Sequence, residues 1–138
     1  MSDDQSVGFG FERLEVWRKA VEFASLFYTI TKGFPREELF GLTMQLRRAA
    51  VSVAANIAEG ASRSSGRDRA RFFEIAYGSL NEIVTMLHVA YGQRLVTDDQ
   101  LAGTRSDVSD MCRMLSGLKR SALSADGCMT RKVESTQP

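Results

Sequence analysis

The chain has 138 residues, a length that suits one domain whose hydrophobic core needs no metal ion or disulfide to support it. Its 18 lysines and arginines nearly balance its 17 aspartates and glutamates, which leaves a formal net charge of +1. This balance excludes the overall basic field of a typical nucleic-acid-binding domain, so any such site has to be a local patch.

The cysteines and the N-terminal residues indicate the compartment. Cys112 and Cys128 belong to no CxxC pair and to no metal-ligand spacing, so we expect free thiols and a cytoplasmic protein. The first residues, MSDDQSVGFG, lack the basic and apolar regions of a signal peptide. No apolar run approaches the ~20 residues that a membrane-spanning helix needs, so we expect no membrane partner.

Four segments with helical periodicity follow one another, and none alternates like a strand. The first helix is expected over residues 12–32, because apolar residues recur every three or four positions until Gly33 and Pro35 end the pattern. The second follows Pro35, and Gly41 is expected to separate a short first turn from a main helix over residues 42–60.

The third helix is expected over residues 67–94, after the polar loop ASRSSG. The fourth is expected from a cap at Thr97 or Asp98 to about Leu123, where the periodicity is lost. Four helices of this length joined by short loops favour an all-α fold, an up-down-up-down antiparallel four-helix bundle.

This periodicity divides the chain into three parts. We expect a disordered N-terminal segment over residues 1–11, a helical bundle over residues 12–124 and a disordered tail over residues 125–138. No internal repeat and no second domain are indicated.

The stretch AAVSVAANIA, residues 49–58, is apolar or small in nearly every direction around its helix. An ordinary bundle helix has a polar back, so a helix without one has to be covered on a second side. Small side chains would let another backbone approach closely, and uncovered apolar surface would promote aggregation. These residues therefore predict a homo-oligomer.

Polar residues interrupt the same helix at intervals of three or four positions and share one face, about 100° from its core stripe. Such groups need partners, because an unsatisfied buried donor or acceptor costs about 1–3 kcal/mol. We expect a polar seam at the edge of the core or between subunits, which would fix the register as a buried Asn does in coiled coils. Its candidate residues are Gln45, Ser52, Asn56 and Glu59, with Ser79 and Glu82 on the third helix as partners.

Three pieces of the sequence are similar to one known family. They are LEVWRKA over residues 14–20, FPREELFGLTMQLRRAAVSVAANIAEG over residues 34–60 and FFEIAYGSLNE over residues 72–82. On these motifs the chain resembles the four-helix-bundle family of the 23S ribosomal-RNA intervening-sequence proteins, which is related to accessory proteins of diversity-generating retroelements. The resemblance covers about residues 11–123.

The resemblance implies a left-handed four-helix bundle that assembles as a homopentamer, a barrel with a central opening, without known enzymatic activity. Some relatives are encoded inside ribosomal-RNA intervening sequences. The retroelement members have strongly basic barrels that are thought to bind RNA and a reverse transcriptase, whereas this chain is near neutral.

Arginines are concentrated in the loop between the second and third helices. Residues 61–71 contain four arginines and one acidic residue, Asp68. They predict a nucleic-acid-binding patch at one end of the bundle, to which the N-terminus of the third helix would add its preference for anions. The alternative is a solvated loop with inter-subunit ion pairs. No stacking aromatics accompany the arginines, because Phe72 and Phe73 are expected in the core. The candidate nucleic-acid-binding residues are Arg47, Arg48, Arg63, Arg67, Arg69 and Arg71.

The sequence gives little support for an enzyme or for a metal-binding protein. Di-iron sites in four-helix bundles need Glu-x-x-His motifs on two helices, whereas the one histidine, His88, has no glutamate three residues before it. A nucleophile–base pair of Cys112 with His88 has no local support. We therefore expect no enzyme, no bound metal and no cofactor.

The residues and the resemblance together predict a non-enzymatic, homo-oligomeric helical scaffold whose leading ligand class is RNA or DNA. The alternative is a protein–protein interaction scaffold that binds no nucleic acid and takes its partner at its oligomeric rim or its C-terminal tail.

Overall fold

The structure, a computed structural model, describes the backbone of residues 8–135 and the side chains of residues 8–126. This part of the chain contains no strand, so the all-α class expected from the sequence is confirmed for it. A 3-10 turn, η2, precedes the first long helix, and two short turns, η3 and η4, precede the second. The elements are η2 (Gly10–Arg13), α1 (Glu15–Thr31), η3 (Arg36–Glu38), η4 (Leu39–Thr43), α2 (Met44–Ala61), α3 (Gly66–Gly92) and α4 (Asp98–Ser135).

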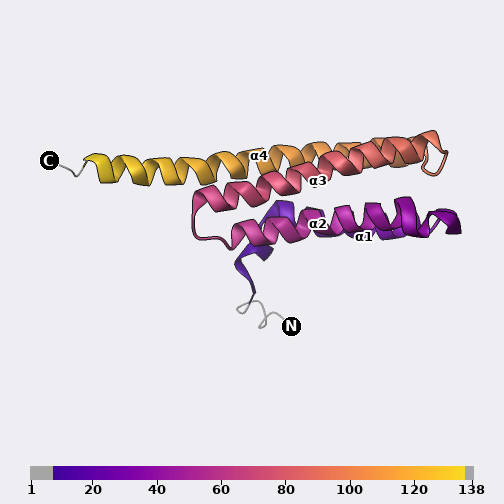
Figure 1. The fold of residues 1–138 in the computed structure, drawn as a ribbon, viewed down its shortest axis with the longest axis horizontal. Helices are drawn as coiled ribbons and strands as arrows, with labels where there is room; N and C mark the ends of the chain where they lie inside the picture. The colour runs from indigo at the N-terminus through magenta and orange to yellow at the C-terminus, as the bar shows by residue number, and fades with distance from the viewer. Residues whose placement is uncertain (1–7, 136–138) are drawn as a thin grey trace.

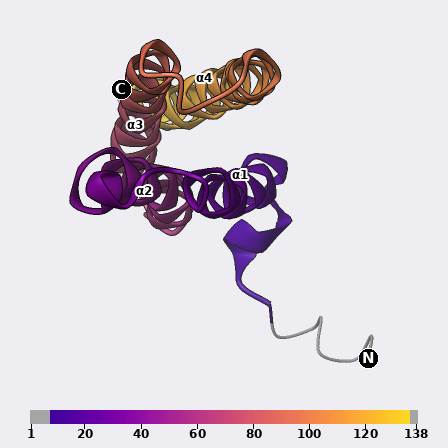
Figure 2. The ribbon, with the colours of Figure 1, turned by 90° about the vertical axis from the view of Figure 1, so that its right-hand side faces the viewer.

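Helices that follow one another in the sequence pack against one another, as Figure 1 shows. α2 contacts both α1 and α3, α3 contacts α4, and α1 makes a slighter contact with α4. The chain reverses its direction after each helix, and Figure 2 shows α1 and α2 in one row with α3 and α4 in the other. No helix in the described part of the chain is both long enough and apolar enough to cross a membrane.

One hydrophobic core draws side chains from all four helices. Phe27 of α1, Ile57 of α2 and Leu80 of α3 are fully buried, and so is Met111 of α4. The buried residues of each helix recur at the three- and four-residue spacing of an amphipathic helix, which is why the sequence pattern located them.

Apolar residues outside these stripes remain on the surface. α1 carries two apolar rows, and the row with Val16, Phe23 and Ile30 is buried. In the neighbouring row, Val21 and Tyr28 are exposed. The described chain therefore leaves apolar surface uncovered, as the sequence indicated.

Gly41 interrupts the helix that follows Pro35, as expected. Its φ of −103° and ψ of −115° are not helical, and the Glu38 carboxylate accepts a hydrogen bond from the Leu42 N–H at 3.3 Å. Because of this break, Phe40 lies outside the core stripe of α2 and is 80% exposed.

α4 runs further than the sequence pattern indicated. The helix continues to Ser135, so residues 125–135, expected to be a disordered tail, are helical. Asp126 accepts hydrogen bonds from the backbone N–H groups of Gly66 and Arg67, which ties α4 to α3 beyond its last buried apolar residue, Ala122. Extending an existing helix is far cheaper than starting one, so loss of apolar periodicity does not end it.

The N-terminal boundary is tested only in part. Residues 1–7 of the segment expected to be disordered lie outside the described residues, whereas Gly10 and Phe11 belong to η2.

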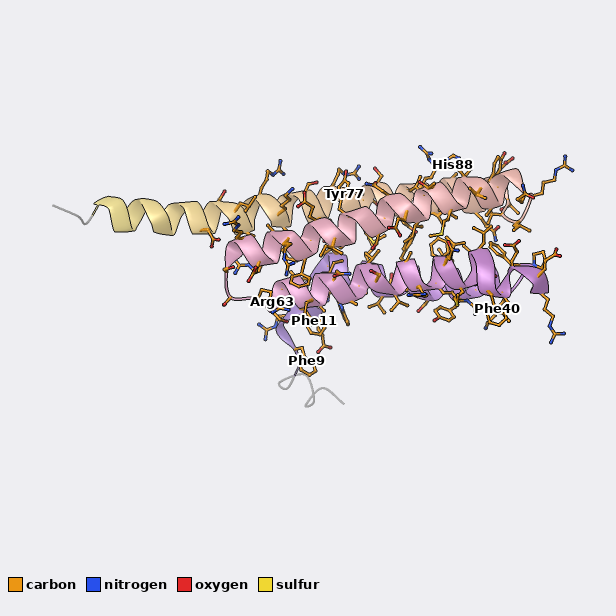
Figure 3. The ribbon with its side chains drawn as sticks, in the orientation of Figure 1. Phe9, Phe11, Phe40, Arg63, Tyr77 and His88 are labelled. Atoms are coloured by element: carbon orange, nitrogen blue, oxygen red, sulfur yellow. The ribbon has the colours of Figure 1, made fainter. Side chains whose placement is uncertain are left out.

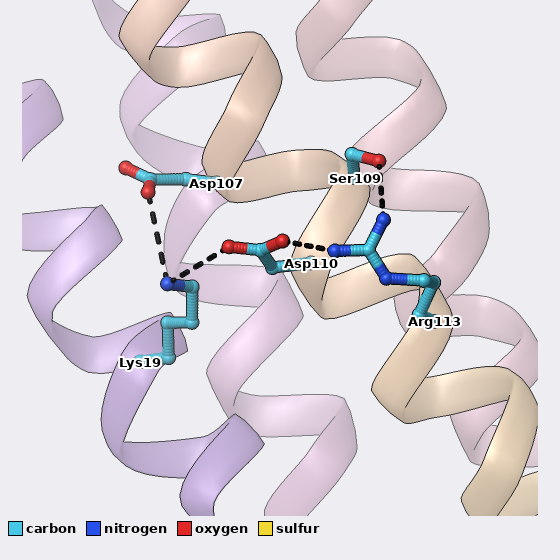
Figure 4. A network of polar contacts seen from close by, with 5 residues as sticks. All are labelled: Lys19, Asp107, Ser109, Asp110 and Arg113. Carbon is cyan, nitrogen blue, oxygen red and sulfur yellow. Dashed lines mark hydrogen bonds and ion pairs between the residues drawn. The ribbon is translucent and has the colours of Figure 1, made fainter.

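Ion pairs bridge the slighter contact between α1 and α4 (Figure 4). The Lys19 ammonium lies 3.7 Å from the Asp107 carboxylate and 3.5 Å from that of Asp110. Asp110 also pairs with Arg113, which donates a hydrogen bond to the Ser109 hydroxyl at 3.2 Å. Exposed pairs of this kind contribute about 0–1 kcal/mol each, so this side of the bundle is held weakly.

Candidate nucleic-acid and subunit interfaces

The six arginines of the expected nucleic-acid patch do not form one cluster. Arg47 and Arg48 are the fourth and fifth residues of α2, whereas Arg63 lies two residues beyond its last residue, Ala61. At about 1.5 Å of rise per residue, roughly 24 Å of helix separate positions 47 and 63. The structure therefore divides the expected patch between the two ends of α2.

Arg47 is held within the bundle. Its Nε donates a hydrogen bond to the Thr31 hydroxyl at 2.8 Å, and its guanidinium lies 4.6 Å from the centre of the Tyr28 ring. The Thr31 hydroxyl in turn donates to the Phe27 carbonyl at 2.6 Å. A cation at the last turn of α1 complements the helix dipole, so Arg47 has a structural role. Arg48 is exposed.

The remaining four arginines surround the turn between α2 and α3, here called the arginine turn (Arg63, Arg67, Arg69 and Arg71). Gly60 allows the close approach that forms it, because a Cβ there would lie 2.9 Å from Phe73 and 3.1 Å from the Arg69 carbonyl oxygen. Small side chains at the end of α2 thus place the first turn of α3 directly against it.

Phe72 orders two of these arginines. The guanidiniums of Arg63 and Arg71 lie 4.8 Å and 4.9 Å from the centre of the Phe72 ring. Arg63 also pairs with Glu59 one turn back on α2. Phe73 is buried as expected, whereas Phe72 is only half-buried and forms the base under two cations.

The other two arginines differ in their surroundings. Arg69 donates to the backbone carbonyl of Ser64 at 3.2 Å and to that of Arg63 at 3.4 Å, so it holds the turn together. Arg67 is exposed. Within the described residues, Arg63 alone among the four has a carboxylate within ion-pair distance.

The N-terminus of α3 does not offer a free anion site, contrary to the expectation. Asp126 of α4 accepts from the backbone N–H of Gly66 at 2.8 Å and from that of Arg67 at 2.7 Å. The Ser65 hydroxyl caps the same turn by accepting from the Asp68 N–H at 3.1 Å. A carboxylate of the chain itself occupies the position that a phosphate would take.

Part of the expected polar seam forms a hydrogen-bond network. The Ser52 and Ser79 hydroxyl oxygens lie 3.1 Å apart and link α2 to α3. The Asn56 amide donates to the Ser52 carbonyl at 2.8 Å and to the Ser52 hydroxyl at 3.0 Å. Glu59 is not part of the network, because it is exposed and pairs with Arg63.

A polar groove of about 730 Å³ continues this network along the α2–α3 boundary. Gln45 and Arg48 enter it from α2, and Glu82 enters it from α3. Gln45 and Glu82 of the expected seam therefore line one groove, but within the described residues no hydrogen bond joins their side chains.

An apolar groove of about 680 Å³ also lies along α2, and it shares Arg48 and Ser52 with the polar groove. Its lining includes Phe40, which is 80% exposed, and Leu39, Tyr28 and Val51, which are 44–46% exposed. Figure 3 shows Phe40 and Arg63 near opposite ends of α2. The sequence pattern missed this site, and its one signal was the Leu-Phe pair that precedes the break at Gly41.

Other reactive side chains are dispersed. Among the described residues, no group of three or more His, Cys, Asp or Glu side chains could hold a metal ion. The His88 Nε2 lies 2.7 Å from the Arg105 guanidinium. His88 is exposed and is labelled in Figure 3. Burial raises the pKa of the Cys112 thiol, and a hydrogen bond with Tyr77 partly offsets this effect.

Comparisons with known proteins identify the family. A crystal structure from Bacteroides thetaiotaomicron VPI-5482, described as a protein with unknown function from the S23 ribosomal protein family, has a similar fold, with a TM-score of 0.70. It is 24% identical, and the match covers 76% of this chain and 95% of that chain. A comparison with curated proteins gave no match. The family model described as 23S rRNA-intervening sequence protein matches residues 12–117, and the chain belongs to that family.

Proposed function

We propose that this protein is a non-enzymatic, homo-oligomeric helical scaffold that binds RNA or DNA through the arginine turn. The observation that carries the binding proposal is the geometry of that turn. Phe72 and the loop carbonyls order three guanidiniums around one short connection, and Arg67 adds a fourth, exposed side chain. Guanidiniums fixed in this way lose little side-chain entropy when they bind phosphate oxygens.

The assembly proposal rests on the exposed face of α2. The apolar groove lined by Phe40, Leu39 and Val51 runs along a helix whose residues 49–58 are small or apolar. Covering this face with a second copy would bury apolar surface that a monomer leaves in water. We propose a left-handed up-down-up-down bundle assembled as a homopentamer, which would present five arginine turns and strengthen binding through avidity.

The nucleic-acid proposal is tested by charge reversal at the arginine turn. Arg67→Glu with Arg71→Glu is expected to lower the affinity for RNA and DNA and to flatten its dependence on salt, because fewer phosphate counterions are released. The matched control is Lys32→Glu with Arg36→Glu, an equal change of charge at exposed positions after α1. Equal losses in both double variants would reject the site, and no binding by the natural sequence at ~50 mM salt would reject the function.

The assembly proposal is tested by light scattering behind size exclusion. The natural sequence is expected to give a mass near five chains that persists at ~0.5 M salt, because apolar contacts are not screened. Phe40→Ser is expected to lower that mass, whereas Val89→Ser, at an exposed valine of α3, leaves it unchanged. A monomer at every concentration would reject the assembly.

The alternative function is a protein-interaction scaffold without nucleic-acid binding. It is favoured by the net charge of +1 and by the exposed Phe40 beside an apolar groove. In that case, a purified partner would bind after nuclease treatment and Phe40→Ser would abolish its binding, whereas the charge reversals at the arginine turn would not.

A further inference from the structure

Three aromatic rings form a ladder that leads from the core to solvent at the N-terminal end of α1. Trp17 packs against the core, and the Phe11 ring lies 5.1 Å from it at an angle of 60°. The Phe9 ring stacks on Phe11 at a centroid distance of 5.7 Å, with only 9° between the ring planes. Phe9 is nevertheless 70% exposed, so most of its ring surface faces solvent.

Backbone hydrogen bonds hold this exposed ring in place. The Phe9 N–H donates to the Glu12 carboxylate at 2.6 Å, and the Glu12 N–H donates to the Phe9 carbonyl at 3.1 Å. The Leu14 N–H then donates to the Phe11 carbonyl at 3.0 Å. The turn therefore presents Phe9 as a fixed platform, and a ligand that stacks on it need not order the backbone first.

The platform and the arginine turn both lie near the C-terminal end of α2. η2 contacts α2, and Figure 3 shows Phe9, Phe11 and Arg63 near the C-terminal end of α2, with Phe40 near its N-terminal end. Arg13 and Arg18 are exposed beside the ladder. The acids Glu12 and Glu59 at this end already bind Phe9 and Arg63, which reduces their repulsion of a phosphate.

We propose that Phe9 is a stacking platform for one base of a single-stranded nucleic acid whose phosphates bind the arginine turn. This inference rests on the proposed function and narrows its ligand class. An exposed aromatic ring beside cations binds an unpaired base through its π-face and the backbone through charge. In a duplex each base is already stacked between its neighbours, so a duplex could use the arginines but not Phe9.

The test compares an oligo(dT) strand of about 16 nucleotides with a duplex of the same length, at low salt, by fluorescence anisotropy. Phe9→Ala and Phe9→Leu are expected to weaken single-strand binding at least about fivefold and to leave duplex binding unchanged. Phe9→Trp is expected to retain the affinity, because it keeps an aromatic face. The matched control is Tyr91→Ala, which removes an exposed aromatic ring from the last turn of α3, at the far end.

The outcomes separate this inference from the function on which it rests. Binding of both probes by the natural sequence, with Phe9→Ala indistinguishable from it, would overturn the platform and leave the arginine turn in place. No binding of either probe would overturn both. Circular dichroism of Phe9→Ala checks that α1 remains folded, so that a loss of binding is assigned to the ring itself.

Discussion

The carboxylate of Asp126, near the C-terminal end of the chain, accepts a hydrogen bond from the backbone N–H of Gly66 at 2.8 Å. It also accepts from the Arg67 N–H at 2.7 Å, so a side chain of α4 caps the N-terminus of α3. The first N–H groups of a helix have no partners within the helix, and a carboxylate there also complements the dipole. This contact joins residues 60 positions apart and holds the arginine turn against α4.

Replacing the cap tests its contribution. Asp126→Ala, which removes both acceptor oxygens, is expected to lower the free energy of unfolding by about 1 kcal/mol, the usual value of a helix cap, and to speed amide exchange at residues 66–68. Glu22→Gln, which removes one negative charge from an exposed position of α1, serves as the control. Equal unfolding midpoints and equal exchange for the two variants would show that Asp126 does not stabilise α3.

The close contact between Gly66 of α3 and the backbone of α4 leads to a second prediction. A Cβ at Gly66 would overlap the backbone carbonyl oxygen of Ala122 and lie 2.9 Å from its carbon, and backbone cannot rotate away as a side chain can. Gly66→Ala is therefore expected to destabilise the protein by about 1–3 kcal/mol in urea denaturation. In the same helix, a Cβ at Gly78 would meet nothing within 4 Å. Gly78→Ala is thus expected to stabilise the protein by about 0.5–1 kcal/mol. If both substitutions changed the free energy of unfolding in the same direction, the close contact of Gly66 with α4 would be contradicted.

The Ser52–Ser79 contact predicts energetic coupling between α2 and α3. Each single change to alanine is expected to cost about 0.5–1.5 kcal/mol, and the double change less than the sum, because both remove the same 3.1 Å hydrogen bond. A double-mutant cycle in urea measures the coupling energy. Additive costs would mean that each hydroxyl is satisfied elsewhere, Ser52 by the Asn56 amide that donates to it.

Cys112 predicts a pH dependence. Burial raises the pKa of its thiol above the ordinary value of 9.0, so the folded state holds its proton at a pH where the unfolded chain has lost it. The resulting contribution to stability is complete below pH 9 and is lost as the pH rises towards the folded-state pKa.

The pH midpoint of iodoacetamide alkylation measures this pKa in a Cys128→Ser variant. The midpoint is expected to be higher in native protein than in urea. Tyr77→Phe is expected to raise it further, because the Tyr77 hydrogen bond lowers the thiol pKa. Native and urea midpoints that coincide would show that burial does not perturb the thiol, whereas slow alkylation with an unchanged midpoint would reflect access alone.

The amino-acid sequence was sufficient to locate the four helices and the core, although not the C-terminal end of α4, because both depend on local periodicity. Apolar spacing located the buried stripes that contain Phe27, Ile57, Leu80 and Met111, and the conformational freedom of glycine marked the break at Gly41. Spacing also placed Ser52 and Asn56 on one face, and the structure joins them in one network with Ser79. Residues 49–58 showed a surplus of apolar surface before any neighbour was known.

Only the tertiary structure decided which of those residues meet. Arg47 and Arg63 belong to the same short motif, yet a helix of 18 residues carries them to opposite ends of the bundle. Asp126, which the sequence placed in a disordered tail, occupies the helix terminus that was expected to bind phosphate. Packing leaves Phe9 and Phe40 exposed to solvent near opposite ends of α2, which apolar periodicity did not indicate. Periodicity describes one helix at a time, whereas a site is made by the contacts between helices, and the energies of those contacts depend on distances that no local pattern contains.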